Sequence, residues 1–176
     1  QLRSNMKKLI LMEKNMKKIL ITSIILLFIG CAAALLDNIP EEDLKVQRVF
    51  EVDLNQGEIY SGSLQWLANT FVDSKEVIEV KDIENGRIIG KGRTHFTNMI
   101  VQIPCRYTVT IEAKDGRVRV TMENFTGLWG EYHNQPRPLG KYKGERKFIE
   151  EVKANLNVLI DDLNNHLNKS KSSSDW

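Results

Sequence analysis

The chain has 176 residues, with 25 Lys and Arg against 23 Asp and Glu, and its formal net charge is only +2. So small a net charge predicts no field that would recruit nucleic acid, and we expect no nucleic-acid partner. Charged residues make up 27% and hydrophobic residues 41%, which is typical of one globular domain with tails.

An export signal is the clearest feature near the N-terminus. Lys17 and Lys18 precede an uncharged apolar run over 19–29, which ends at Gly30 and Cys31. A basic segment, a short apolar run and a small residue before the cut are typical of a signal peptide, and a cysteine just after the small residue is typical of a bacterial lipoprotein. We therefore expect a signal peptide over 16–30 and lipidation of Cys31, whose two or three acyl chains would hold the chain on a membrane.

The alternative is an uncleaved membrane helix, because the uncharged stretch over 19–36 has about the minimum length for a span. Phe28 also replaces the leucine of the usual lipoprotein pattern. Both interpretations predict a membrane-attached protein of the bacterial cell envelope that faces the periplasm or the cell surface. Residues 6–11 nearly repeat 16–21, and we exclude the upstream segment 1–15 from the mature protein.

The first half of the predicted domain contains one strand and one helix. The acidic segment 31–45 contains Pro40 and is predicted to be an extended tether. Alternating apolar residues predict a strand over 46–53. The spacing of Ile59, Trp66 and Leu67 then predicts a helix, with Asn55 and Glu58 as its capping box.

Four strands follow, over 77–84, 87–96, 101–114 and 117–124. Asn85-Gly86 predicts a type I′ turn and Asp115-Gly116 a second hairpin. Pro104 lacks a donor, so we expect it at a sheet edge or a bulge. Cys105 lies on the apolar side of its strand and is predicted to be a buried thiol, because no partner cysteine remains once Cys31 is acylated.

A long connection over 125–143 and an amphipathic helix over 145–167 complete the predicted domain, 46–168, and 169–176 is expected to be a disordered tail. The order β-α-β-β-β-β-α predicts an α+β fold. Its antiparallel sheet would have two helices on one face and solvent on the other, because each helix has a single apolar stripe.

The chain resembles a family of exported bacterial lipoproteins of unknown function whose domain has a TATA-binding-protein-like fold. The resemblance covers 46–167 and is carried by Phe50–Val52, Ser63–Ala68, Ser74–Ile78, Gly86–Gly92, Tyr107–Ile111 and Arg117–Val120. It implies the fold and export, and no activity or catalytic residue. The DNA binding of the protein that gives the fold its name is not implied by a shared fold.

Basic residues on the open sheet face form the first candidate site. Arg93 and His95 alternate on one strand, while Arg106 and Arg119 lie on the next two. Together they would hold a carboxylate or phosphate group. The alternative is a solvated face on which Glu79, Glu112 and Glu123 neutralise these cations.

The aromatic connection is the second candidate site. Trp129, Tyr132 and His133 are predicted to form a contact surface for an envelope protein or a glycan, with Arg137 beside them. The alternative is that Trp129 and Tyr132 only cover an exposed end of the core.

No motif predicts catalysis, a metal site or a cofactor, since His95, His133 and His166 have no ligand spacing. We expect a membrane-anchored binding or assembly module of unknown oligomeric state. The alternatives are an enzyme or enzyme inhibitor acting on envelope glycans or peptides, and a prophage-encoded exclusion lipoprotein.

Overall fold

The computed structural model describes residues 12, 16, 39–71 and 78–172, without the side chains of 143 and 170–172. The chain divides into two compact units, 1–38 and 39–176. In the first unit only the exposed Met12 and Met16 are described, so the predicted signal peptide and Cys31 lie outside the described residues. Within the described segments, no helix combines the length and the apolar composition that crossing a membrane requires.

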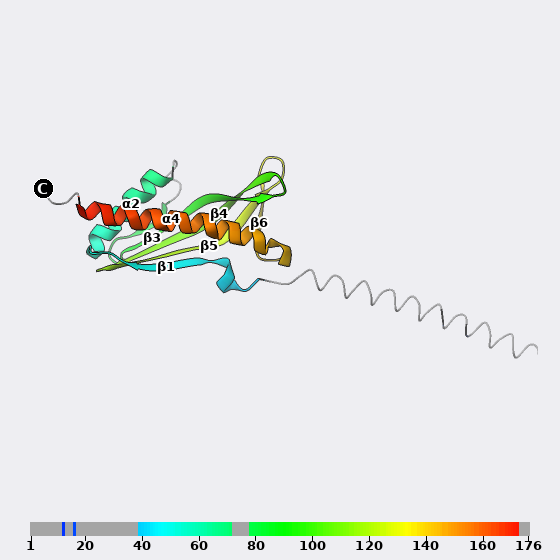
Figure 1. Cartoon of the computed structure of the whole chain (residues 1–176), viewed down its shortest axis with the longest axis horizontal. Coiled ribbons are helices and arrows are strands. Elements are labelled where there is room, and N and C mark those ends of the chain that lie inside the picture. Colours follow the sequence, from blue (N-terminus) through cyan, green and yellow to red (C-terminus); the bar gives the residue numbers. More distant parts are fainter. Residues whose placement is uncertain (1–11, 13–15, 17–38, 72–77, 173–176) are drawn as a thin grey trace, which may run out of the picture. The chain divides into compact units, whose positions relative to one another are not determined.

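The second unit is an antiparallel sheet covered on one face by two helices, as predicted (Figure 1). The sheet has six strands in the order β1-β5-β4-β3-β2, and β6 pairs with the far part of β5. The elements in chain order are η1 Glu41–Leu44, β1 Val46–Glu51, α2 Gln56–Thr70, β2 Ile78–Asp82, β3 Arg87–Asn98, β4 Val101–Lys114, β5 Arg117–Trp129, β6 Gln135–Pro138, η2 Lys143–Glu145 and α4 Arg146–Ser172.

The core lies between the sheet and the two helices. Val118, Val120 and Met122 alternate along β5 and are fully buried, because every second side chain of a strand points to the same face. The predicted capping box at the start of α2 is confirmed, with Asn55 and Glu58 each accepting from the other's backbone N–H.

The turn at Asn85-Gly86 differs from the predicted type I′ turn. Only Gly86 has a positive φ, of 62°. β2 and β3 pair from Asp82 to Arg87, which leaves four residues in the turn instead of two. The Asn85 amide donates to the Asp82 carboxylate at 2.8 Å, so this side chain stabilises a wider turn. The second hairpin, at Asp115-Gly116, is confirmed.

Pro104 does not lie on an edge strand, because β4 is the middle strand of the main sheet path. The missing N–H of Pro104 is tolerated near the start of β4, because pairing with β5 begins only at the next residue, Cys105. On its other side Pro104 lies opposite His95 of β3. Cys105 is fully buried, as predicted.

The predicted connection over 125–143 is largely a hairpin. β5 continues to Trp129 through a bulge, where Asn124 and Phe125 together face Tyr107. Asn124 has a φ of 61°, and the extra residue returns Phe125 to the core side. The chain then turns back as β6, and this short edge strand escaped prediction because two of its four residues are prolines.

Two predicted tails are partly ordered. Helix α4 continues to Ser172, so the predicted disordered tail is wrong as far as that residue, and 173–176 lie outside the described residues. The last part of the predicted tether also packs on the domain. Ile39 is buried and its N–H donates to the carbonyl of Gly140 at 2.9 Å, and the side chain of Leu44 in η1 packs against Gly140.

Candidate functional sites

The open sheet face brings only part of the predicted basic set together. Arg93 of β3 lies directly opposite Arg106 of β4, and His95 lies opposite Pro104. Arg119 faces Glu112 of β4. Because Glu112 is six residues from Arg106 along that strand, Arg119 and Arg106 are about 20 Å apart in the strand direction. Arg119 therefore does not join the group formed by Arg93, His95 and Arg106.

Acidic residues neutralise only some of the cations on the open sheet face. Lys91 contacts Glu79 at 2.6 Å and Arg119 contacts Glu112 at 3.4 Å, as the alternative interpretation predicts. Arg93 and Arg106 are exposed, and no ion pair joins either of them to an acid of the described residues. Two like charges directly opposite each other destabilise a sheet. This pair is thus the part of the open face that suits an anionic group.

The aromatic hairpin, which we define as Leu128 to Pro138, contains the second predicted site. Trp129 is half-buried and packs on Phe96 and Phe148, with ring centroids 5.5 and 6.2 Å away. Trp129 therefore belongs to the end of the core. Tyr132 is 79% exposed at the turn. His133 is exposed as well, with a φ of 53° and its Nδ1 3.2 Å from the Leu128 carbonyl.

Arg137 is held by contacts inside the domain. Its guanidinium lies 4.5 Å from the Trp129 ring centroid and 5.4 Å from that of Tyr142. Its Nη2 lies 2.8 Å from Oε1 of Glu145, whose side chain is 4% exposed. Oε2 of Glu145 accepts the N–H of Gly140 at 2.9 Å and that of Tyr142 at 3.3 Å. Glu145 thus fastens the hairpin to the start of α4, a role that no sequence pattern indicated.

A cavity of about 450 Å³ lies against this hairpin and is lined by Trp129, Gln135, Pro136 and Arg137. An aromatic ring beside an amide and a guanidinium offers both a flat apolar surface and hydrogen-bond donors. Of the four predicted hairpin residues, the structure places Trp129 and Arg137 at this cavity and leaves Tyr132 and His133 exposed at the turn.

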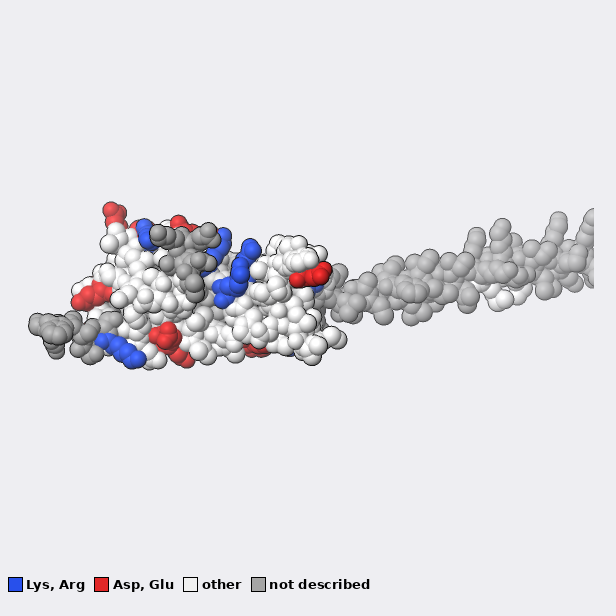
Figure 2. Space-filling view, turned by 90° about the horizontal axis from the view of Figure 1, so that it is seen from above, with Lys and Arg blue, Asp and Glu red and all other residues white. Residues whose placement is uncertain are grey.

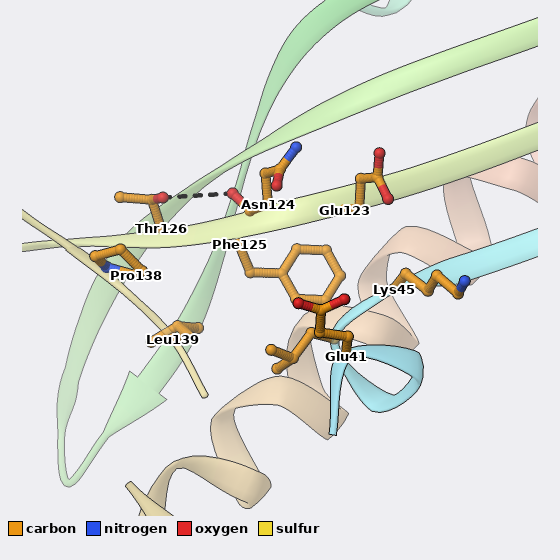
Figure 3. A pocket seen from close by; sticks show the side chains of 9 residues that line it. Glu41, Lys45, Glu123, Asn124, Phe125, Thr126, Pro138 and Leu139 are labelled. Atoms are coloured by element: carbon orange, nitrogen blue, oxygen red, sulfur yellow. Dashed lines mark hydrogen bonds between the residues drawn. The ribbon is translucent and has the colours of Figure 1, made fainter. Parts of the chain in front are cut away.

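A second cavity, of about 360 Å³, lies in the gap between β1 and β6 along the edge of β5 (Figure 3). Its polar groups come from Glu41, Lys45, Glu123, Asn124 and Thr126, and its apolar ones from Leu44, Phe125, Pro138 and Leu139. The hydroxyl of Thr126 donates to the Asn124 carbonyl at 3.3 Å, which braces the bulge (Figure 3). The sequence did not predict this cavity. The only signal was that the spacing of apolar residues along β5 changes from two positions to three between Met122 and Phe125.

The most strongly shifted titratable groups lie in the core, away from both cavities. Burial raises the pKa of the Cys105 thiol from 9.0 to about 12. Burial also raises the pKa of Tyr107, and the nearby Cys105 thiolate would raise it further. Across residues 39–71 and 78–172, no three His, Cys, Asp or Glu side chains gather in a way that would hold a metal ion.

Two kinds of comparison relate the chain to known proteins. Residues 47–127 match the model of a domain of unknown function with a TBP-like fold, DUF4468. A TBP-like protein from Parabacteroides distasonis has a TM-score of 0.57 and 11% identity, over 70% of this chain and 91% of that one. A DUF4468 family protein from Bacteroides ovatus has a TM-score of 0.55 and 16% identity, over 75% and 93% of the two chains. No curated protein sequence matches significantly.

At these identities the solved structures show the fold alone. The predicted TATA-binding-protein-like fold is therefore confirmed, whereas export and lipidation stay predictions. Residues 47–127 thus match the DUF4468 family model, and the domain that contains them has a TBP-like fold.

Proposed function

We propose that the protein is a bacterial envelope lipoprotein, anchored through Cys31, whose domain is a binding or assembly module. The observation that carries the proposal is the aromatic hairpin, in which Trp129 and Arg137 line a cavity while Tyr132 and His133 are exposed at the turn. Aromatic and arginine side chains supply much of the energy of protein interfaces and also offer surfaces on which sugar rings stack. The partner is an envelope protein or a glycan.

Preorganisation supports this use of the hairpin. Trp129 is packed on Phe96 and Phe148, and Arg137 is fixed by Glu145. A surface whose side chains are already ordered loses less conformational entropy on binding. The two groups with strongly raised pKa values, Cys105 and Tyr107, are enclosed in the core and reach neither cavity, so they do not support an enzyme.

The anchor is tested by the mass of the protein purified from bacterial membranes. Acylation should add the mass of the lipid, and cleavage before Cys31 should remove residues 1–30. Both changes should vanish with Cys31→Ser, whereas globomycin should prevent the cleavage and leave the lipid mass in place. A full-length protein of unmodified mass would refute the anchor.

The binding surface is tested by placing a photo-crosslinking amino acid at Tyr132 in the native envelope. Val158, an exposed apolar residue of α4, serves as the matched control position. A discrete adduct at position 132, absent at 158 and lost with Trp129→Ala, would support the hairpin. Equal labelling at both positions, or none at 132, would refute it.

A further inference from the structure

We infer that the β3–β4 hairpin is a second, lipid-facing contact, whose tip enters the surface of an anionic bilayer while Arg93 and Arg106 face the headgroups. The inference rests on the proposed lipid anchor and adds a site to it. It is carried by three features of one hairpin, namely an exposed apolar tip, backbone strain at that tip and a basic stem that contains no acid.

The tip consists of Met99, Ile100 and Val101, all exposed. Met99 is 90% and Ile100 95% exposed, and the two form the turn that joins β3 to β4. Contiguous apolar side chains this exposed are uncommon on soluble domains and mark an interaction site. Two long aliphatic side chains at the end of a hairpin suit shallow insertion into lipid better than a flat protein interface.

The backbone of the apolar tip is strained. Met99 has a φ of 57°, in the left-handed region where glycine and asparagine are favoured. A two-residue hairpin turn with a positive φ at its first central residue only normally takes glycine there, which would relax the backbone. The hairpin instead holds a large apolar side chain in an unfavourable conformation, and such outliers point toward functional positions.

The stem of the hairpin is basic. The sequence contains no Asp or Glu from Asn85 to Ile111. The described stem presents Arg93 opposite Arg106, with His95 nearer the tip. Two acidic residues on elements that pack against the hairpin have other partners. Glu79 pairs with Lys91, and Glu151 of α4 accepts from the N–H and the hydroxyl of Thr97. Arg93 and Arg106 therefore keep their positive charge available to lipid phosphates.

The hairpin tip lies on the half of the domain that the chain enters. Figure 1 shows the tips of the β3–β4 and β5–β6 hairpins on the same half of the sheet as η1 but beyond it, and Val46, which follows η1, is level with Val109 of β4, eight positions from Val101. Ile39 follows Cys31 by eight residues, a separation of at most about 27 Å when fully extended. An anchor at Cys31 therefore keeps this end of the domain within reach of the bilayer.

The surface charges agree with this placement. Figure 2 shows Lys and Arg side chains in the middle of the visible face, and a mainly uncharged surface with one acidic group toward the end where Figure 1 places the hairpin tips. Basic side chains set back from an exposed apolar tip are the arrangement by which long cationic side chains reach headgroups above an inserted tip.

The test uses the acylated full-length protein in vesicles of phosphatidylethanolamine and phosphatidylglycerol. An environment-sensitive nitrobenzoxadiazole probe is attached at Ile100→Cys or, as the matched control, at Ile83→Cys. Ile83 is 67% exposed in the β2–β3 turn, at the opposite end of β3, and Cys105 is buried and does not react. We expect a blue shift and quenching by spin-labelled lipid at position 100, and neither effect at position 83.

The charge requirement has its own variants. Arg93→Gln with Arg106→Gln should lower the ratio of inserted to free tip by about 10- to 30-fold, because each cation contributes about tenfold or less at an anionic surface. Arg117→Gln, an exposed arginine at the far end of β5, should leave the ratio unchanged. An equal shift on phosphatidylcholine alone would overturn the role of the arginines.

The outcomes separate the two proposals. A protein that carries acyl chains on Cys31 but shows an aqueous probe at position 100 overturns the hairpin contact and leaves the anchor intact. Equal blue shifts at positions 100 and 83 also overturn it, because a defined orientation is then absent. Absence of acyl mass refutes the anchor. The same probes are then measured on Cys31→Ser protein added to the vesicles, and an aqueous probe at position 100 in that protein overturns the hairpin contact as well.

Discussion

Glu145 should be the residue on which the position of the aromatic hairpin depends most. Its side chain is almost fully buried, and Oε2 accepts the backbone N–H groups of Gly140 and Tyr142. Replacement by alanine leaves the buried Gly140 N–H without an acceptor, at a cost of about 1–3 kcal/mol, and removes a second, charge-assisted bond. Arg137 is 42% exposed and regains water, so the ion pair itself adds less than about 1 kcal/mol.

We therefore expect Glu145→Ala to lower the free energy of unfolding by about 3 kcal/mol, and to lower Tm by about 10 °C in a domain of this size. Glu145→Gln is the matched control, because its amide oxygen still accepts from Gly140 while the charge opposite Arg137 is lost. This control should cost only about 1 kcal/mol. Thermal and urea unfolding followed by circular dichroism measure both values.

Comparing the stabilities of Glu145→Ala and Glu145→Gln separates the contribution of the charge from that of the backbone hydrogen bonds. If alanine and glutamine destabilise the domain equally, the charge is what counts, and the backbone hydrogen bonds of Glu145 contribute nothing. If neither variant changes Tm, the hairpin is held by its aromatic packing alone. Limited proteolysis at residues 130–134 gives an independent readout, since a released hairpin should be cut faster in Glu145→Ala than in Glu145→Gln.

Four further outcomes follow from the core and the hairpin tip. Tyr107→Phe should raise stability by about 1 kcal/mol in urea titration, because the buried hydroxyl has no hydrogen-bond partner among the described residues. Burial raises the pKa of the Cys105 thiol from 9.0 to about 12, so the contribution of the protonated thiol to the free energy of unfolding should be complete below pH 9 and lost by about pH 12, at about 1.4 kcal/mol per pH unit. The free energy of unfolding measured across that range should therefore depend less on pH in Cys105→Ala. Met99→Gly should raise Tm by a few degrees in calorimetry, because glycine adopts the positive φ of this position without strain, and a lower Tm would contradict the strain at the tip. Gly92→Ala should destabilise the fold by about 3 kcal/mol, since its Cβ would overlap the buried ring of Tyr107, and wild-type stability would show that the ring can move.

Local patterns accounted for most of the fold. The alternation along β4 and β5 placed Val109, Ile111, Val118 and Val120 in the core, because a strand with one covered face repeats every second residue. The capping box at Asn55 was also readable, since its two residues are three apart in the chain. Features built from neighbouring residues are predictable because the contact that makes them is local.

The candidate sites were only partly readable for the opposite reason. The sequence indicated that Arg93 and Arg106 share the open face, but the register alone shows that they lie opposite each other and that Arg119 does not join them. Trp129 and Arg137 were predicted to face a partner, with coverage of the core by Trp129 as the alternative. Their actual contacts come from Phe148 and Glu145, which follow them in the chain by 19 and 8 positions.

The sequence by itself determined the succession of elements, the apolar face of each strand and helix, and the predicted lipoprotein signal, since each of these is a property of adjacent residues. Only the tertiary structure decided that the bulge at Asn124 opens a cavity, that Glu145 holds the hairpin, and that Met99 and Ile100 project from a basic stem. These features arise where distant segments meet, and the geometry of such a meeting is set by how the whole sheet twists and packs against its helices.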